Sequence, residues 1–241
     1  MNSLLNANKA ILSQKRSLLK AILTKNEQDL NKATEMFTRP CPIIKASIGQ
    51  HYRHSMDHLE LAALLAFSAV NNSSHNSLDG ITTLNGTQSG IPEEDVSSLF
   101  SKESDEVFVG PFKKDTPTLH YDLRVRGGTL EKDFKEATKR IESVHQILHE
   151  LQGTPSHKDN KSLLLLGSHP VNASFMLSSN DGQEMELKST VGRELGFAAH
   201  HAIHHLAMVK VIAFQTLGFE ASDLPSDFGM APSTTHFEKS N

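Results

Sequence analysis

Residues 190–217 read TVGRELGFAAHHAIHHLAMVKVIAFQTL and include the longest apolar stretch of the chain. Its apolar residues recur at helical spacing, and Gly218 directly after it is a typical helix stop. The stretch is long enough to cross a bilayer, but it carries Arg193, Glu194, Lys210 and four histidines. It therefore predicts a long helix buried in a protein core, not a membrane span.

The four histidines of this helix form two interleaved pairs that face different sides. At about 100° per residue, His201 and His205 lie about 40° apart on the apolar face. His200 and His204 lie toward Arg193, on a more mixed face. The inward pair, His201 and His205, is therefore the better candidate for a buried site.

A second histidine stripe lies on a helix predicted over 47–70, with Ser47 as its N-cap. His51, His54 and His58 fall within roughly 60° of one another on the apolar side of this helix. These histidines therefore also face the core. The chain holds 14 histidines, but their clustering on two buried faces is more informative than their number.

Histidines on two buried faces indicate a divalent metal ion. Burying imidazoles among aliphatic side chains costs free energy unless each nitrogen finds a partner, and one ion satisfies three of them. Two histidines four residues apart on one helix, with a third from a facing helix, leave a coordination position for water or substrate. The alternative is a set of core histidines bonded to backbone, carboxylates or water.

Glu194 lies two turns before His201 on the same face of the last helix. Its carboxylate is a candidate hydrogen-bond partner that would orient a ligand histidine. A helix-cap or salt-bridge role is equally consistent with its position near the helix start.

The rest of the chain completes a helical domain. Helical spacing predicts one long helix over 4–37, with room for a single break, and another from Thr129 that Gly153 ends. The Asn-Asp-Gly at 180–182 predicts a small hairpin, and the polar, then acidic stretch 71–117 predicts a mobile insertion. The expected fold class is all-α: an antiparallel four-helix bundle with a small β-hairpin between the third and fourth long helices.

Composition limits the classes of function. A formal net charge of -4 without an extended Lys/Arg cluster disfavours nucleic-acid binding. Cys41 is the single cysteine, and the start of the chain lacks the continuous apolar core of a signal peptide, so a cytoplasmic location is expected. The expected partner is a small-molecule substrate, not a membrane or a nucleic acid, and a homodimer is left open.

Four stretches resemble the DinB superfamily, also called the YfiT-like metalloenzymes: SIGQHYRHSMDHLE at 47–60, YDLRVRG at 121–127, TVGRELGFAAHHAIHH at 190–205 and FGMAPSTTHFE at 228–238. The resemblance covers most of the chain outside the insertion and implies a single DinB-like domain over 1–241. It implies an up-down-down-up four-helix bundle that binds zinc, nickel or iron. The family's ligands are one histidine of the second helix and a His-x-x-x-His of the last.

The resemblance implies metal ligands His54, His201 and His205, with His51 and His58 as alternates. His201 and His205 match the family's His-x-x-x-His. The second-helix histidine of the family is followed by an acidic residue about one turn later, which favours His54 with Asp57.

The superfamily includes thiol-dependent S-transferases and an isomerase that uses a thiol cofactor. The resemblance therefore implies a divalent-metal-dependent enzyme, either a thiol-type S-transferase or a hydrolase of a small molecule, with a small thiol as cosubstrate. No catalytic side chain is assigned, because a bound ion would itself activate water or a thiol. The alternative is a non-catalytic, metal-stabilised helix bundle that acts as a binding module.

Tyr121, Arg124 and Arg126 of the YDLRVRG motif are candidate substrate-binding residues. Arginine pairs carboxylates through two parallel hydrogen bonds, so these side chains would form an anion-recognising edge. A loop that its arginines keep solvated is the alternative.

Overall fold

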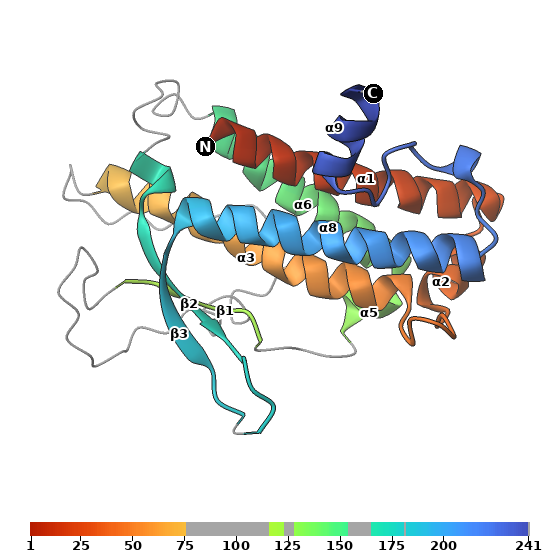
Figure 1. The fold of residues 1–241 in the computed structure, drawn as a ribbon, viewed down its shortest axis with the longest axis horizontal. Helices are drawn as coiled ribbons and strands as arrows, with labels where there is room; N and C mark the ends of the chain where they lie inside the picture. The colour runs from red at the N-terminus through yellow and green to blue at the C-terminus, as the bar shows by residue number, and fades with distance from the viewer. Residues whose placement is uncertain (76–115, 123–127, 154–164, 181, 241) are drawn as a thin grey trace.

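The structure, a computed structural model, describes residues 1–75, 116–122, 128–153, 165–180 and 182–240. The described chain is mostly helical with a small three-stranded sheet, which confirms the helical class expected from the sequence. The longest described helices run lengthwise beside one another, with the sheet on one side of them (Figure 1). They are α1 (Asn2–Lys25), α3 (Ile48–His75), α6 (Phe134–Gly153) and α8 (Val191–Thr216).

The long helices enclose one hydrophobic core. Helix α3 packs against both α8 and α6, and α1 also packs against α6 and α8. The apolar face of each helix is turned inward, as the helical spacing of the sequence predicts. Buried core residues include Leu12, Leu18, Met56, Leu59, Ile141, Leu148, Val209 and Ile212.

The helix expected over 4–37 is broken once, into α1 and α2 (Leu30–Thr38). Glu27 and Gln28 adopt left-handed φ angles of 54° and 64°, which a continuing α-helix cannot contain. The Asp29 side chain then accepts hydrogen bonds from two backbone amides of α2 and starts the new helix.

The helix expected from Thr129 is also split, into α5 (Thr129–Lys132) and α6. Asp133 between them has an extended backbone, with φ -122° and ψ 118°. Its carboxylate accepts hydrogen bonds from the amides of Lys135 (2.7 Å) and Glu136 (3.2 Å). Asp133 thus caps α6, and the expectation of one continuous helix was wrong at this residue.

The predicted hairpin is present, and a further strand joins it. Strands β2 (Pro170–Phe175) and β3 (Met185–Thr190) pair antiparallel, as expected. The additional strand β1 (Thr118–His120) pairs parallel with β2. This pairing places Tyr121 beside the start of α8. The Tyr121 amide donates a hydrogen bond to the carbonyl of Ser174 in β2 (3.1 Å).

Most of the insertion predicted at 71–117 lies outside the described residues. At its start the structure differs from the prediction, because α3 continues past residue 70 to His75. Residues 71–75 contain neither glycine nor proline, so nothing in this segment stops the helix.

Helix α8 follows β3 without a loop. Thr190 ends the strand and caps the helix, since its hydroxyl oxygen accepts a hydrogen bond from the Arg193 amide (3.2 Å). Gly218, with φ 65°, follows the last turn and confirms the predicted stop. No helix within the described ranges combines the length and apolarity needed to cross a membrane.

Candidate metal centre

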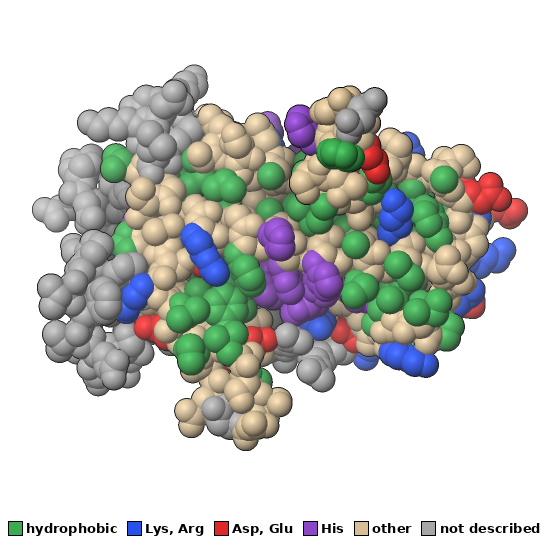
Figure 2. Space-filling model, in the orientation of Figure 1, with side chains coloured by type: hydrophobic (Ala, Val, Ile, Leu, Met, Phe, Trp, Pro, Cys, Tyr) green, Lys and Arg blue, Asp and Glu red, His purple; other side chains and the backbone are tan. Residues whose placement is uncertain are grey.

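Five histidines from α3 and α8 form one cluster where these two helices pack together. Figure 2 shows histidine side chains gathered near the middle of one face of the molecule, over α8. Helix α3 contributes the stripe that the sequence analysis placed toward the core, and α8 contributes the inward pair. The five are His51, His54, His58, His201 and His205.

His201 lies at the centre of the cluster. Its Nε2 atom is 3.1 Å from Nε2 of His54 and 3.1 Å from Nε2 of His205. Two imidazole nitrogens bound tetrahedrally to one zinc ion at about 2.0–2.1 Å lie roughly 3.3 Å apart. His201 therefore lies at a metal-sharing distance from each of the other two expected ligands.

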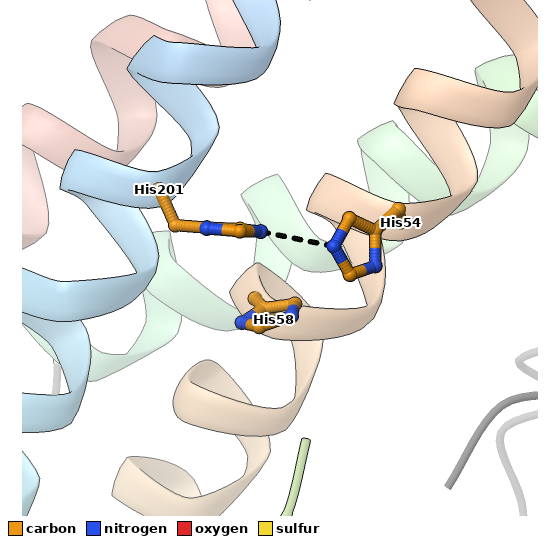
Figure 3. A group of neighbouring side chains, drawn as sticks. All are labelled: His54, His58 and His201. Atoms are coloured by element: carbon orange, nitrogen blue, oxygen red, sulfur yellow. Dashed lines mark hydrogen bonds between the residues drawn. The ribbon is translucent and has the colours of Figure 1, made fainter. Parts of the chain in front are cut away.

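His58 joins His54 and His201 in an overlapping group. Each of these three residues offers a ring nitrogen, and the three nitrogens lie within 4.8 Å of one another. Figure 3 shows His54 and His58 reaching from α3 toward His201 on α8. His58, not His205, is therefore the third member of the group whose nitrogens all converge, and His205 contacts this group through His201.

His51 does not belong to the group of His54, His58 and His201, but it contacts His205. The Nδ1 atoms of the two rings are 2.8 Å apart. If His205 binds metal through Nε2, its proton must be on Nδ1, and it donates to His51. Metal-binding histidines commonly donate their other N–H in this way. This contact favours His205 as a ligand, and it makes His51 the residue that orients it.

Burial lowers the pKa of two imidazoles of the cluster, His51 and His205. Burial, followed by the neighbouring rings of His201 and His54, lowers the pKa of His205 from 6.5 to about 2. Burial and the nearby charge of Lys15 lower the pKa of His51 to about 4. Only neutral imidazole binds a metal ion, so His205 can bind one at neutral pH without first losing a proton.

Acid is expected to destabilise the metal-free protein between about pH 6.5 and about pH 4. In this range the unfolded chain protonates His51 while the folded chain keeps it neutral, so the unfolded state binds more protons and stability falls as pH falls. Urea unfolding across this range measures the slope. His51→Gln should flatten it, whereas His236→Gln, at an exposed histidine, should not. Equal slopes in both variants would contradict the assignment.

Tyr121, a predicted substrate-binding residue, packs beside the histidine cluster and is buried. Its ring stacks on His58, with centroids 4.6 Å apart and planes 19° apart. Its hydroxyl donates to Oε2 of Glu194 (2.6 Å), and burial together with that carboxylate raises its pKa. Arg124 and Arg126, the other residues predicted for this edge, lie outside the described residues.

Glu194 is a fully buried carboxylate. Besides Tyr121, it accepts hydrogen bonds from the hydroxyl of Ser189 and from Nη1 of Arg193 (2.7 Å). The expected role as partner of a ligand histidine is therefore indirect, since Glu194 holds Tyr121, which packs on His58. The salt-bridge role that the sequence analysis left open is present as well.

Asp57, whose spacing after His54 supported the resemblance, contacts two arginines. Its carboxylate binds Arg53 (2.8 Å) and Arg140 of α6 (2.8 Å). These arginines also bind Glu131 and Glu60, which forms a charge network between α3, α5 and α6. Asp57 thus helps to position α3.

The sequence analysis missed the aromatic residues beside the histidines. The Phe197 ring lies 5.8 Å from His201 and 5.3 Å from Phe175 of β2. Phe197 could have been found from the sequence, because it lies four residues, about one turn, before His201 on the same side of α8. No comparable signal exists for Phe175, because its position depends on how the hairpin docks.

Comparison with known proteins assigns this chain to no family. No family model matches it, and no solved structure matches it. A protein of Rhizopus delemar described as FK506-binding protein 5 is 34% identical over 122 residues, which is 50% of this chain and 28% of that protein. The chain thus spans less than a third of the relative's length, and the match bears neither for nor against a DinB-like assignment.

Proposed function

We propose that this chain is a divalent-metal-dependent enzyme of the DinB-like type that acts on a small molecule as a thiol-type S-transferase or a hydrolase. The observation that carries the proposal is the position of His201 Nε2, 3.1 Å from Nε2 of both His54 and His205. Half-buried imidazoles at this spacing have the chemistry of a site for zinc, nickel or iron.

The arrangement of the long helices supports the same assignment. The proposed fold is the up-down-down-up four-helix bundle of that superfamily, made of α1, α3, α6 and α8 in one domain. Helix α3 packs on α8, and this contact brings the histidines of the second and fourth long helices together. Such inward-facing side chains on neighbouring helices are how bundles build metal sites.

Side chains of this chain would hold the ion, orient its ligands and shield the site from water. A divalent ion held by three histidines would lower the pKa of a bound water or thiol and polarise a substrate carbonyl. His51 fixes the orientation of His205 through their 2.8 Å contact. Tyr121, anchored by Glu194, supports His58, and Phe197 excludes water from one side of the site.

A non-catalytic, metal-stabilised binding module is the second candidate, and one observation favours it. His58 lies close enough to His54 and His201 to offer a further nitrogen. With His205 also bound, four protein nitrogens would fill a tetrahedral ion and leave no position for substrate.

Cobalt substitution decides between the two candidates. For the enzyme, we expect one cobalt ion per chain and a new thiolate-to-cobalt charge-transfer band when a small thiol is added, because a position is open for sulfur. A cobalt spectrum that thiol does not change in the wild type, but does change in His58→Gln, would identify the closed site and overturn the enzyme. If cobalt and zinc both fail to bind, the metal proposal itself is wrong.

The proposed location remains the cytosol. Cys41, the single cysteine of the chain, is buried and reduced in the loop that follows α2. A chain that uses no disulfide is typical of a reducing compartment.

A further inference from the structure

Helix α8 carries a stripe of functional side chains that extends beyond the histidines. Arg193, Phe197, His201 and His205 follow one another at intervals of four residues, which keeps them on one side of the helix. At a rise of about 1.5 Å per residue, Arg193 begins about 12 Å from His201 along the helix axis. Phe197 lies midway between them.

Aromatic rings connect the histidine cluster to Arg193. Phe197 lies 5.7 Å from the His58 ring on one side and 5.3 Å from Phe175 on the other. The Tyr121 ring stacks on the Phe175 ring, with centroids 4.9 Å apart, and so joins the same group of aromatic rings. Phe175 and Phe197 are only half-buried, so they present an apolar surface next to the histidines. Figure 2 shows hydrophobic and basic side chains gathered beside the histidine patch.

Arg193 ends this apolar surface with a positive charge. Its guanidinium lies 5.0 Å from the Phe197 ring centre and 5.8 Å from that of Phe175. One nitrogen, Nη1, binds Glu194, while the side chain as a whole is 50% exposed. A guanidinium has five N–H donors, so most of them can face an incoming ligand. The buried carboxylate of Glu194 thus holds the Arg193 side chain in place through Nη1, and the other N–H donors are available to a ligand.

We infer that Arg193, Phe197 and Phe175 form a substrate subsite for a small amphipathic anion. Its carboxylate would bind the Arg193 guanidinium, and an apolar or aromatic segment would cover Phe197. A thiol or another reactive group, on the order of 10 Å from the carboxylate, would reach His201. Only this last step rests on the proposed function, since the arginine and the two rings are independent of a metal ion.

The test measures the binding of 3-phenylpropionate and of its uncharged amide, 3-phenylpropanamide, to the full chain. Ligand-observed NMR with a chelator present excludes coordination of the carboxylate to a metal ion. We expect the acid to bind at least about tenfold more tightly than the amide, because an arginine–carboxylate pair is a charge-assisted interaction. Arg193→Gln should remove this difference, and Phe197→Ala should weaken both ligands.

Arg39→Gln is the matched control. Arg39 is 46% exposed and pairs with Glu35 at 3.0 Å, so it resembles Arg193 in exposure and in its ion pair, but it lies at the end of α2, outside the helix and the strand that carry the subsite. Its replacement should leave both affinities unchanged. If Arg193→Gln unfolds the chain, Arg193→Lys replaces it, and loss of the paired hydrogen bonds should still weaken binding of the acid several-fold.

Two results would overturn the subsite. One is equal binding of acid and amide to the wild type in the presence of chelator, including no binding of either. The other is the same loss in Arg193→Gln and Arg39→Gln. Repeating the titration with zinc separates this inference from the proposed function. Failure of zinc to bind overturns the metal site, whereas the chelated samples still decide the role of Arg193.

Discussion

Replacing His201 with alanine is expected to lower zinc affinity by about a hundredfold to a thousandfold. The Nε2 atom of His201 is the one nitrogen within 3.1 Å of both His54 and His205, and it also belongs to the group with His58. Its loss therefore damages every ligand set that the cluster offers. Structural zinc sites contribute about 10–16 kcal/mol through four ligands, so one ligand corresponds to about 2.5–4 kcal/mol.

Competition with a chromogenic chelator measures this affinity, and elemental analysis gives the metal content of the purified chain. His200→Ala is the matched control, because His200 is the neighbouring histidine but is exposed on α8. It should bind zinc like the wild type. If His201→Ala also retained its zinc, or if both variants lost it equally, the ion would have to be held elsewhere and the cluster would not be the metal centre.

The α8 part of this site could be predicted from helical periodicity alone. Residues 191–216 are helical, and His201 and His205 lie on the side that packs against α3. Periodicity could not select one histidine of α3, because His51, His54 and His58 share a narrow stripe. Their different roles depend on how far α3 is shifted along α8. That shift is a property of the tertiary packing.

Other parts of the site depend on contacts between distant segments. Strand β1 has three residues, too few for a period-2 pattern, yet it carries Tyr121 to Glu194 and His58. Asp133 interrupts a continuous apolar pattern because its carboxylate caps α6, and the pattern contains no sign of the break. Short-range signals therefore predicted the helices, but not the wall around the histidines.

Ion pairs to α5 and α6 hold the position of α3. Glu131 of α5 binds Nε of Arg53 (2.9 Å), and Asp57 binds Arg140 of α6 (2.8 Å). Each of these two pairs joins α3 to a helix, α5 or α6, that does not contain a histidine ligand. The network thus fixes the rotation of α3, which in turn determines where His54 points.

Replacing Gly49 with alanine is therefore expected to destabilise the fold by about 2–4 kcal/mol. A Cβ at this position would overlap the backbone carbonyl oxygen of Glu131 and lie 2.9 Å from Cε1 of Phe37. The carbonyl belongs to α5, so the clash cannot be relieved by rotating a side chain. Either α3 or α5 must move, and the bond between Arg53 and Glu131 would be strained with it.

Urea unfolding of the metal-free chain measures this loss. Gly153→Ala is the control, since no atom lies within 4 Å of a Cβ at the end of α6, and it should be neutral or stabilising by up to about 1 kcal/mol. Equal stabilities of the two variants would show that α5 does not constrain α3. Because His51 lies only two residues after Gly49, a shift of α3 should also weaken zinc binding. A Gly49→Ala chain that loses stability but binds zinc normally would mean that the histidines are positioned by α8 alone.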